Sequence, residues 1–209
     1  MKTVLLWLHL CALVLLSAQV CAGTWYVDGS VSASGDGKSW ETAFQMIQEG
    51  MNAASHGDTV VVGEGTYYEN VAFRGKNIIL RSKDSLDPAT VAATIIDADE
   101  VGPGVAFSGE ETESAVLEGF TLQNGKGLTG GGICGGTSDK HCRVTIRNNI
   151  ITDNWADLWG GGIAWCDGTI EKNTVKGNSA EGADAKGAGL GDSEKPMSRK
   201  YMAMQRPYD

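Results

Sequence analysis

The chain has 209 residues and a formal net charge of −9, and 29 of its residues are glycine. This glycine content is about twice the average usage, but only 4 prolines and no collagen-like period accompany it, which excludes collagen and a proline-rich disordered tract. The acidic balance argues against a nucleic-acid partner, because phosphate recognition needs a basic surface.

Residues 1–22 have the composition of a signal peptide. Lys2 supplies a positive charge, an apolar run follows over residues 4–16, and small residues precede Gly23. The run is too short for a stable membrane span, and no later segment is apolar enough for one. We therefore expect cleavage before Gly23 and a mature protein, of a length that suits one domain, that is secreted or held at the cell surface.

Residues 23–57 are predicted to form an amino-terminal strand and a capping helix. The helix is expected over residues 40–54, where apolar residues recur at spacings of three and four. These residues are Trp40, Phe44, Ile47, Met51 and Ala54. Because the open end of a solenoid exposes a row of unpaired strand groups, we expect this helix to cover it.

Residues 58–190 are predicted to form the coils of a parallel β-helix. Residues 144–154 repeat as residues 168–178, so that three positions match at an offset of 24 residues. The matching pairs are Ile146 with Ile170, Asn149 with Asn173, and Asn154 with Asn178. Repeats of this period indicate a solenoid, and short alternating strand signals without room for a crossover helix indicate β-coils.

Asparagine and glycine are expected to shape the corners of these coils. Asparagine tolerates the left-handed backbone conformation, so Asn149 and Asn173 are predicted to adopt it and to stack as a ladder. Glycine blocks recur at residues 130–132 and 160–162, with a degraded copy at residues 187–189. Without side chains, they allow tight bends and close approach between coils.

Three cysteines follow the signal segment, namely Cys134, Cys142 and Cys166. In an oxidising compartment they form either one disulfide, most simply Cys134–Cys142, or free thiols. Their spacing does not suit zinc, and no metal site is predicted. Residues 191–209 lose the repeat pattern and are predicted to be a disordered or aberrant tail, either the truncated end of a longer solenoid or a natural flexible tail.

Residues 57–71, with the sequence GDTVVVGEGTYYENV, resemble the entry to the pectate-lyase-like right-handed parallel β-helix superfamily. With the glycine-block repeats, the chain is similar over residues 24–190 to secreted bacterial β-helix proteins labelled probable pectate lyases. The resemblance implies an all-β fold, a right-handed parallel β-helix with an amino-terminal capping helix. It implies little about activity, since one fold hosts many functions.

Lyases of this superfamily use an arginine or lysine base and a Ca²⁺ ion held by several acidic oxygens. The candidate acids are Asp153, Asp157, Asp167 and Glu171, and the candidate cations are Arg143, Arg147 and Lys172. Arg147 and Glu171 are expected to be one position out of register. Residues 165–168 match part of a lyase motif but lack its histidine, and the hydrolase set is absent, so no complete catalytic motif is present. Calcium is thus expected only if the chain is lyase-like, and no other cofactor is evident.

Three tryptophans, Trp155, Trp159 and Trp165, cluster around the second repeat. Flat aromatic rings can stack on sugar rings, so together with Asp153, Asp157 and Asp167 they are the predicted substrate-binding residues. The alternative is that the tryptophans fill loops and the acids are solvated.

Two functions are carried forward from these patterns. The first is an exported protein associated with polysaccharide, either a uronate-polymer lyase or a non-catalytic relative. The alternative is a structural or adhesive repeat module of a bacterial surface or autotransporter protein. Acids and an arginine converging on one groove would favour the enzyme.

Overall fold

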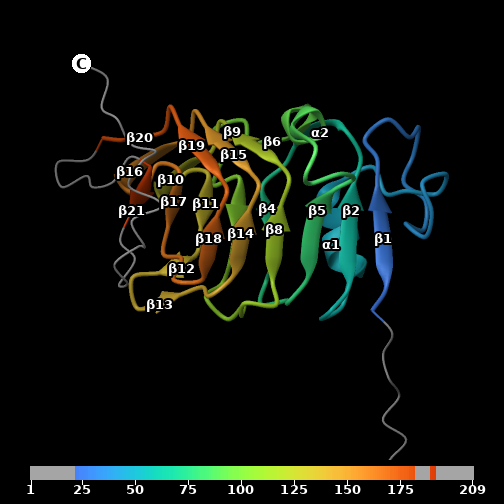
Figure 1. Ribbon diagram of the computed structural model, residues 1–209, viewed down its shortest axis with the longest axis horizontal. Coiled ribbons are helices and arrows are strands. Elements are labelled where there is room, and N and C mark those ends of the chain that lie inside the picture. Colours follow the sequence, from blue (N-terminus) through green and yellow to red (C-terminus); the bar gives the residue numbers. More distant parts are fainter. Residues whose placement is uncertain (1–21, 182–188, 192–209) are drawn as a thin grey trace, which may run out of the picture.

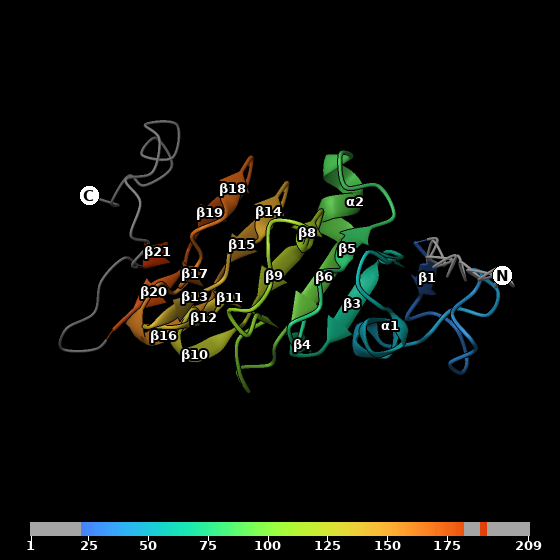
Figure 2. The same ribbon diagram turned by 90° about the horizontal axis from the view of Figure 1, so that it is seen from below.

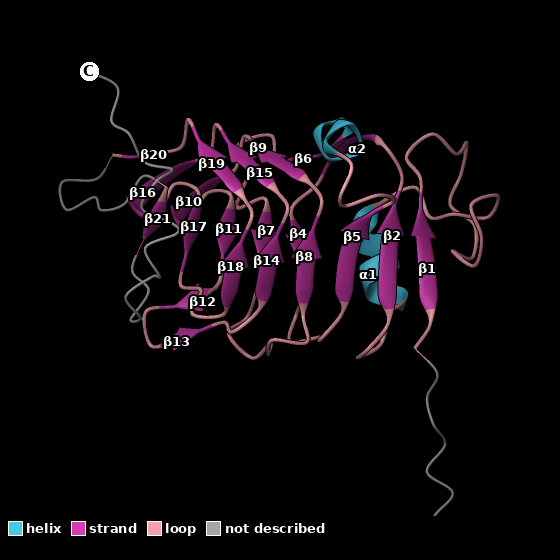
Figure 3. Cartoon of the chain, in the orientation of Figure 1, coloured by secondary structure: helices cyan, strands magenta, loops and turns pink. Residues whose placement is uncertain are grey.

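The computed structural model describes residues 22–181 and 189–191, which form mostly β-strands with two short helices (Figures 1 and 3). The predictions for the signal segment and for the tail therefore lie almost wholly outside the described residues.

Most of the strands belong to three long parallel sheets. The first sheet contains β1 (Thr24–Val27), β2 (Thr59–Val62), β5 (Ile79–Ser82), β8 (Val116–Glu118), β14 (Thr145–Arg147) and β18 (Thr169–Glu171). The second contains β3 (Gly65–Tyr68), β6 (Thr94–Asp97), β9 (Thr121–Gln123), β15 (Ile150–Thr152) and β19 (Thr174–Lys176). The third contains β4 (Val71–Ala72), β7 (Val105–Ala106), β11 (Ile133–Cys134), β17 (Ile163–Ala164) and β21 (Leu190–Gly191).

Two smaller sheets complete the structure. The strands β10 (Lys126–Thr129), β16 (Trp155–Trp159) and β20 (Ser179–Ala180) form a three-stranded parallel sheet. The strands β12 (Gly136–Thr137) and β13 (Lys140–His141) form an antiparallel hairpin that the repeat pattern does not predict.

From β2 onward the chain visits the three long sheets in a fixed cyclic order, which is compatible with a β-helix. Thus β2, β3 and β4 are followed by β5, β6 and β7, each strand lying parallel to its equivalent one passage earlier. Figure 2 shows the second sheet as neighbouring strands running from β3 to β19. The offset of 24 residues is confirmed, since Ile146 pairs with Ile170 and Ile151 with Val175.

Apolar residues stack in register to make the core. In the first sheet one row joins Val60, Leu80, Leu117, Ile146 and Ile170, all of them buried. Burial of each such side chain contributes about 1.5–3 kcal/mol, so the repeated apolar positions supply the driving force for stacking one passage on the next.

The predicted asparagine ladder is present, but the left-handed residue is its neighbour. Asn149 and Asn173 are buried, and Asn149 Nδ2 donates to Asn173 Oδ1 at 3.0 Å. The positive φ angles belong to the preceding residues, Asn148 (56°) and Lys172 (54°). The corner thus places a strained residue outside and turns the next asparagine inward, where its amide can bond to backbone groups of both adjacent passages.

A second ladder runs at the following corner. Asn154 Oδ1 accepts from Gly125 N at 2.8 Å, and Asn154 Nδ2 donates to Asn178 Oδ1 at 2.9 Å. Close backbone approach accompanies it, since a Cβ atom on Gly131 would lie 2.2 Å from the carbonyl oxygen of Trp155. The glycine blocks therefore occupy positions where no side chain fits.

The predicted helix over residues 40–54 is shorter in the structure, where α1 spans Ile47–Ala53. Phe44 lies in extended backbone, bridges Val27 and stacks on Trp25 with ring centroids 6.1 Å apart. The apolar spacing of residues 40–44 therefore reflects packing along β1. Helix α1 buries Ile47 and Met51 in the core.

Two features at helix starts depend on polar contacts. The carboxylate of Glu69 accepts the backbone N–H groups of Ile47 at 2.7 Å and Gln48 at 2.9 Å, and so satisfies the first turn of α1. The short helix α2 (Pro88–Ala93) was not predicted, although Asp87 and Pro88 are a typical start signal. Asp87 accepts from Ala89 N and Thr90 N there.

Candidate functional site

The structure divides the predicted binding residues between two places. Asp153 and Trp155 line one groove, whereas Trp159, Trp165 and Asp167 lie around His141. Asp157 is exposed on β16 and lines neither place.

The first place, here called the Trp155 groove, has a cavity volume of about 320 Å³. Its lining residues come from consecutive passages of the chain and are Glu100, Asn124, Gly125, Lys126, Asp153, Trp155 and Glu181.

The Trp155 groove is built on the second asparagine ladder. Asn124 and Asp153 occupy equivalent left-handed corners, with φ angles of 54° and 55°, and Asn124 N donates to Asp153 O at 3.2 Å. Immediately after these corners β10 and β16 begin, and Lys126 pairs in register with Trp155. Each corner therefore presents one polar side chain outward, followed by a strand residue beside it.

The charges of the groove are mostly negative. Lys126 lies with Nζ 5.1 Å from the centre of the Trp155 ring and 3.9 Å from Glu100 Oε2. Both partners of this ion pair are exposed, so it contributes little to stability. Three carboxylates, from Glu100, Asp153 and Glu181, thus share the lining with the single ammonium group of Lys126.

The second place, here called the His141 cluster, consists of His141, Trp159, Trp165 and Asp167. His141 Nδ1 lies 3.1 Å from Asp167 Oδ2, and the His141 and Trp159 rings lie 5.0 and 5.1 Å from the Trp165 ring. Trp165 is only 4% exposed and donates its indole N–H to Thr129 Oγ1 at 2.8 Å. The packing alternative is therefore favoured for Trp165.

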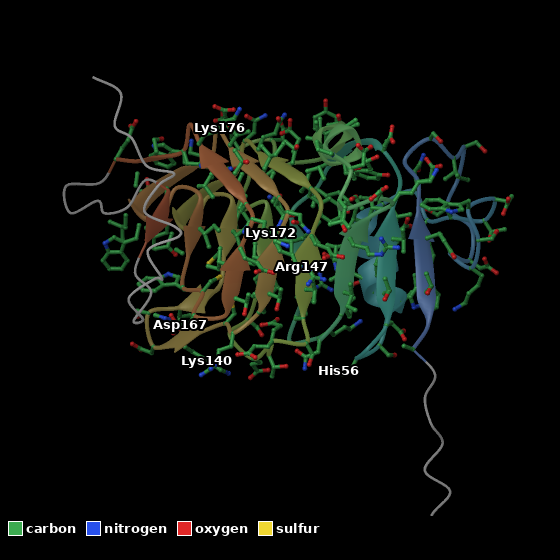
Figure 4. All side chains as sticks on the ribbon, in the orientation of Figure 1. His56, Lys140, Arg147, Asp167, Lys172 and Lys176 are labelled. Carbon is green, nitrogen blue, oxygen red and sulfur yellow. The ribbon has the colours of Figure 1, made fainter. Side chains whose placement is uncertain are left out.

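His141 is a residue that the sequence patterns did not single out. Its Nε2 atom and Asp167 Oδ1 are buried without a hydrogen-bond partner among the described residues. The pairing that could have located it is the bridge between Cys142 and Cys166, which brings residues 141 and 167 onto neighbouring passages. Figure 4 shows Asp167 at the same end of the molecule as Lys140.

A second groove of about 360 Å³ lies beside His141 and is lined by Glu110, Glu113 and Arg143 among others. Arg143 Nη2 lies 3.7 Å from Glu113 Oε1, and Lys140 Nζ lies 2.8 Å from Glu110 Oε1. The hydrogen bond and charge of Lys140 hold the pKa of Glu110 below its usual range. The candidate cation Arg143 is thus already paired with a carboxylate.

The outer face of the first sheet carries Arg147, Glu118 and Glu171. The expectation that Arg147 and Glu171 are out of register was wrong, since they are direct partners on β14 and β18, as the offset of 24 residues itself requires. The Arg147 guanidinium nevertheless hydrogen-bonds Glu118 on the opposite side. Figure 4 shows Arg147 and Lys172 near the middle of this face.

The candidate acids do not converge on a metal site. Asp153 lies at a corner, Asp157 on β16, Asp167 beside His141 and Glu171 on β18. In the described ranges, no group of three or more histidine, cysteine, aspartate or glutamate side chains could hold a metal ion.

Comparison with protein-family models, curated proteins and solved structures finds no match to this chain. Among the residues described, no helix has the length and apolar character needed to cross a membrane.

Proposed function

We propose that the parallel sheets close into a right-handed parallel β-helix related to the pectate-lyase-like superfamily, and that the protein is exported. The cyclic strand order, the in-register apolar rows and the asparagine ladders support the first part. Residues 1–22 support the second through their composition. Expression in a secreting host followed by mass determination tests export, with a mature chain that starts at Gly23 as the expected result.

We propose further that the exported protein binds polysaccharide through the Trp155 groove. The observation that carries this is the half-buried Trp155 ring beside Asp153 and Asn124 in one cavity. An aromatic face packs against the apolar C–H face of a sugar ring, while carboxylate and amide groups bond its hydroxyls. A solenoid surface also suits an elongated ligand.

The charge of the groove narrows the class of polysaccharide. Three carboxylates face one ammonium group, so a uronate polymer would bring its own negative charges against them. Sugar hydroxyls carry no such cost and can donate to Asp153. We therefore propose a neutral polysaccharide as the ligand of this groove.

The test is affinity electrophoresis of the full chain on a panel of neutral and uronate polysaccharides. Trp155→Ala is expected to weaken binding about tenfold, which corresponds to about 1.4 kcal/mol. Asp153→Asn tests the carboxylate and keeps the left-handed corner, because asparagine tolerates positive φ. Tyr68→Ala removes another exposed aromatic ring, outside the groove, and should leave binding unchanged. Equal losses in Trp155→Ala and Tyr68→Ala would contradict the assignment.

A second assay separates the remaining functions. Absorbance of unsaturated products is followed on uronate polymers with Ca²⁺ and then with a chelator. A chelator-sensitive signal would replace the binding proposal with lyase activity. If the chain gives neither product nor retention on any polysaccharide, the structural or adhesive alternative stands.

A further inference from the structure

Two buried cysteine thiols from consecutive passages of the chain lie against each other. Cys142 Sγ and Cys166 Sγ are 3.1 Å apart, and the two residues are 0% and 3% exposed. They come from the segments that enter β14 and β18 and form an isolated parallel bridge. The contact is therefore fixed by the backbone on both sides.

The backbone hydrogen bonds hold this pair in strand geometry. Cys142 N donates to Trp165 O at 3.0 Å, and Asp167 N donates to Cys142 O at 2.9 Å. Neighbouring parallel strands lie about 4.8 Å apart, which is within the range of about 4.4–6.8 Å between Cα atoms joined by a disulfide. A closing movement of about 1 Å would bring the sulfur atoms to the bonded distance of about 2.05 Å.

The third cysteine lies apart from this contact. Cys134 pairs in register with Ala106 and Ala164, and its Sγ donates to Gly136 O at 3.5 Å. The next residue, Gly135, makes room for the sulfur pair, because a Cβ atom there would lie 2.4 Å from Cys166 Sγ. The simplest pairing expected from the sequence, Cys134–Cys142, is therefore not the one that the fold prepares.

We propose that Cys142 and Cys166 form a disulfide bond that covalently links consecutive coils of the exported protein. The co-reactant is a disulfide, either of low molecular weight or of an oxidoreductase. One cysteine thiolate attacks it, forms a mixed disulfide and releases one thiol. The second thiolate then attacks the mixed disulfide, forms the Cys142–Cys166 bond and releases the second thiol. The protein loses two protons and two electrons, and the co-reactant is reduced to two thiols.

The reaction belongs to folding rather than to the finished structure. Exchange requires a thiolate and access to solvent. Contact with Cys142, together with burial, raises the pKa of the Cys166 thiol well above its usual range. The bond therefore forms while the Cys166 passage is still settling on the one before it. Once formed, it lies inside the core and is protected from reductant.

The experiment maps cysteine pairing in the full chain. The protein is refolded with oxidised and reduced glutathione, free thiols are blocked, and non-reduced proteolytic fragments are analysed by mass spectrometry. The expected result is one fragment pair joined through Cys142 and Cys166, lighter by two hydrogen atoms than the separate fragments, with Cys134 blocked. Complete blocking of both Cys142 and Cys166, or a bond that involves Cys134, would overturn the proposal.

Thermal unfolding supplies a second measurement. A disulfide that closes a loop of this length typically raises the melting temperature on the order of 5–15 °C. Oxidised protein should therefore melt higher than protein reduced before refolding. Cys166→Ala should abolish the difference, and the matched variant Cys134→Ala should retain it. A difference that persists in Cys166→Ala would overturn the assignment, and fragment mapping of the unaltered chain decides the matter even if that variant fails to fold.

Discussion

Asn149 is joined to Asn173, one coil further along the chain, by two hydrogen bonds that end on a single oxygen. The Nδ2 and backbone N atoms of Asn149 each lie 3.0 Å from Asn173 Oδ1. Asn149 in turn serves the preceding coil, since its Oδ1 accepts from Phe120 N and its Nδ2 donates to Leu117 O, both at 3.0 Å. A single buried amide thus satisfies backbone groups that would otherwise lack partners at a corner.

Replacement of Asn149 by alanine is expected to lower the free energy of unfolding by about 3 kcal/mol. The change leaves Phe120 N, Leu117 O and Asn173 Oδ1 without a partner in the core, and each unsatisfied buried group costs about 1–3 kcal/mol. Urea denaturation measures the effect. Asn148→Gly is the matched control, because glycine also adopts the left-handed conformation of Asn148, and it should be nearly neutral. Equal losses in the two variants would contradict a role specific to the inward amide.

Replacement of Gly131 by alanine is expected to cost about 3 kcal/mol through steric overlap. The added Cβ atom would lie 2.2 Å from Trp155 O and 2.7 Å from Gly161 O, and backbone atoms cannot move aside as a flexible side chain can. Thermal melting compares this variant with Gly102→Ala, where the nearest atom is 3.4 Å away. If Gly131→Ala melts no lower than Gly102→Ala, the coils are less tightly spaced than described.

The two carboxylates that flank Arg147 are predicted to differ in their contribution to stability. Glu118 hydrogen-bonds the guanidinium and its side chain is 9% exposed, whereas Glu171 is the register partner but makes no ion pair with Arg147 among the described residues. Glu118→Gln should therefore lower the free energy of unfolding by about 1 kcal/mol, a value discounted because Arg147 is 41% exposed. Glu171→Gln should change it by less than about 0.5 kcal/mol. The reverse order in chemical denaturation would contradict this pairing.

Periodicity predicted what depends on stacking. The matching positions Ile146 and Ile170 indicated in-register strands because an apolar side chain in one coil needs an equivalent neighbour in the next. The asparagine ladder followed from the same offset. The conformation at the corner could not be assigned by residue type, since Asn148 and Lys172 both adopt it, and the turn rather than the side chain determines which residue becomes left-handed.

Contacts between unlike residues escaped sequence reasoning. Phe44 fitted a helical spacing but pairs with Val27 across a loop, and Glu69 satisfies the start of a helix more than twenty positions earlier. His141 and Asp167 belong to passages whose alignment is visible only through the Cys142 bridge. Among the predicted binding residues, only Asp153 and Trp155 lie in one groove, because the corner offset places them beside Asn124 and Lys126.

Asp97 makes the stability of the protein sensitive to acid. It ends β6, is 6% exposed, and receives hydrogen bonds from Gln123 Nε2 at 2.8 Å, Asn124 Nδ2 at 2.9 Å and Asp99 N at 3.1 Å. Burial by itself raises the pKa of Asp97, but these hydrogen bonds outweigh it and hold the pKa below its usual range. The carboxylate form therefore stabilises the folded protein.

The sign of the pH dependence follows from this depressed pKa. The contribution of Asp97 is fully present above the pKa of an unfolded aspartate, about 3.9, and is lost as the pH falls from there through the lower pKa of the folded state. Asp97→Asn is less stable than the unaltered chain at neutral pH, because its amide group faces the donors of Gln123 and Asn124. The stability difference between the two proteins should shrink as the pH is lowered below about 4.

Urea denaturation at a series of pH values from about 6 to 2.5 measures this difference. Asp139→Asn alters an exposed aspartate in the loop between β12 and β13, so its stability should run parallel to that of the unaltered chain at every pH. Every other carboxylate is common to all three proteins and cancels in the comparison. A difference for Asp97→Asn that stays constant or grows in acid would mean that the Gln123 and Asn124 amides do not favour the charged form of Asp97.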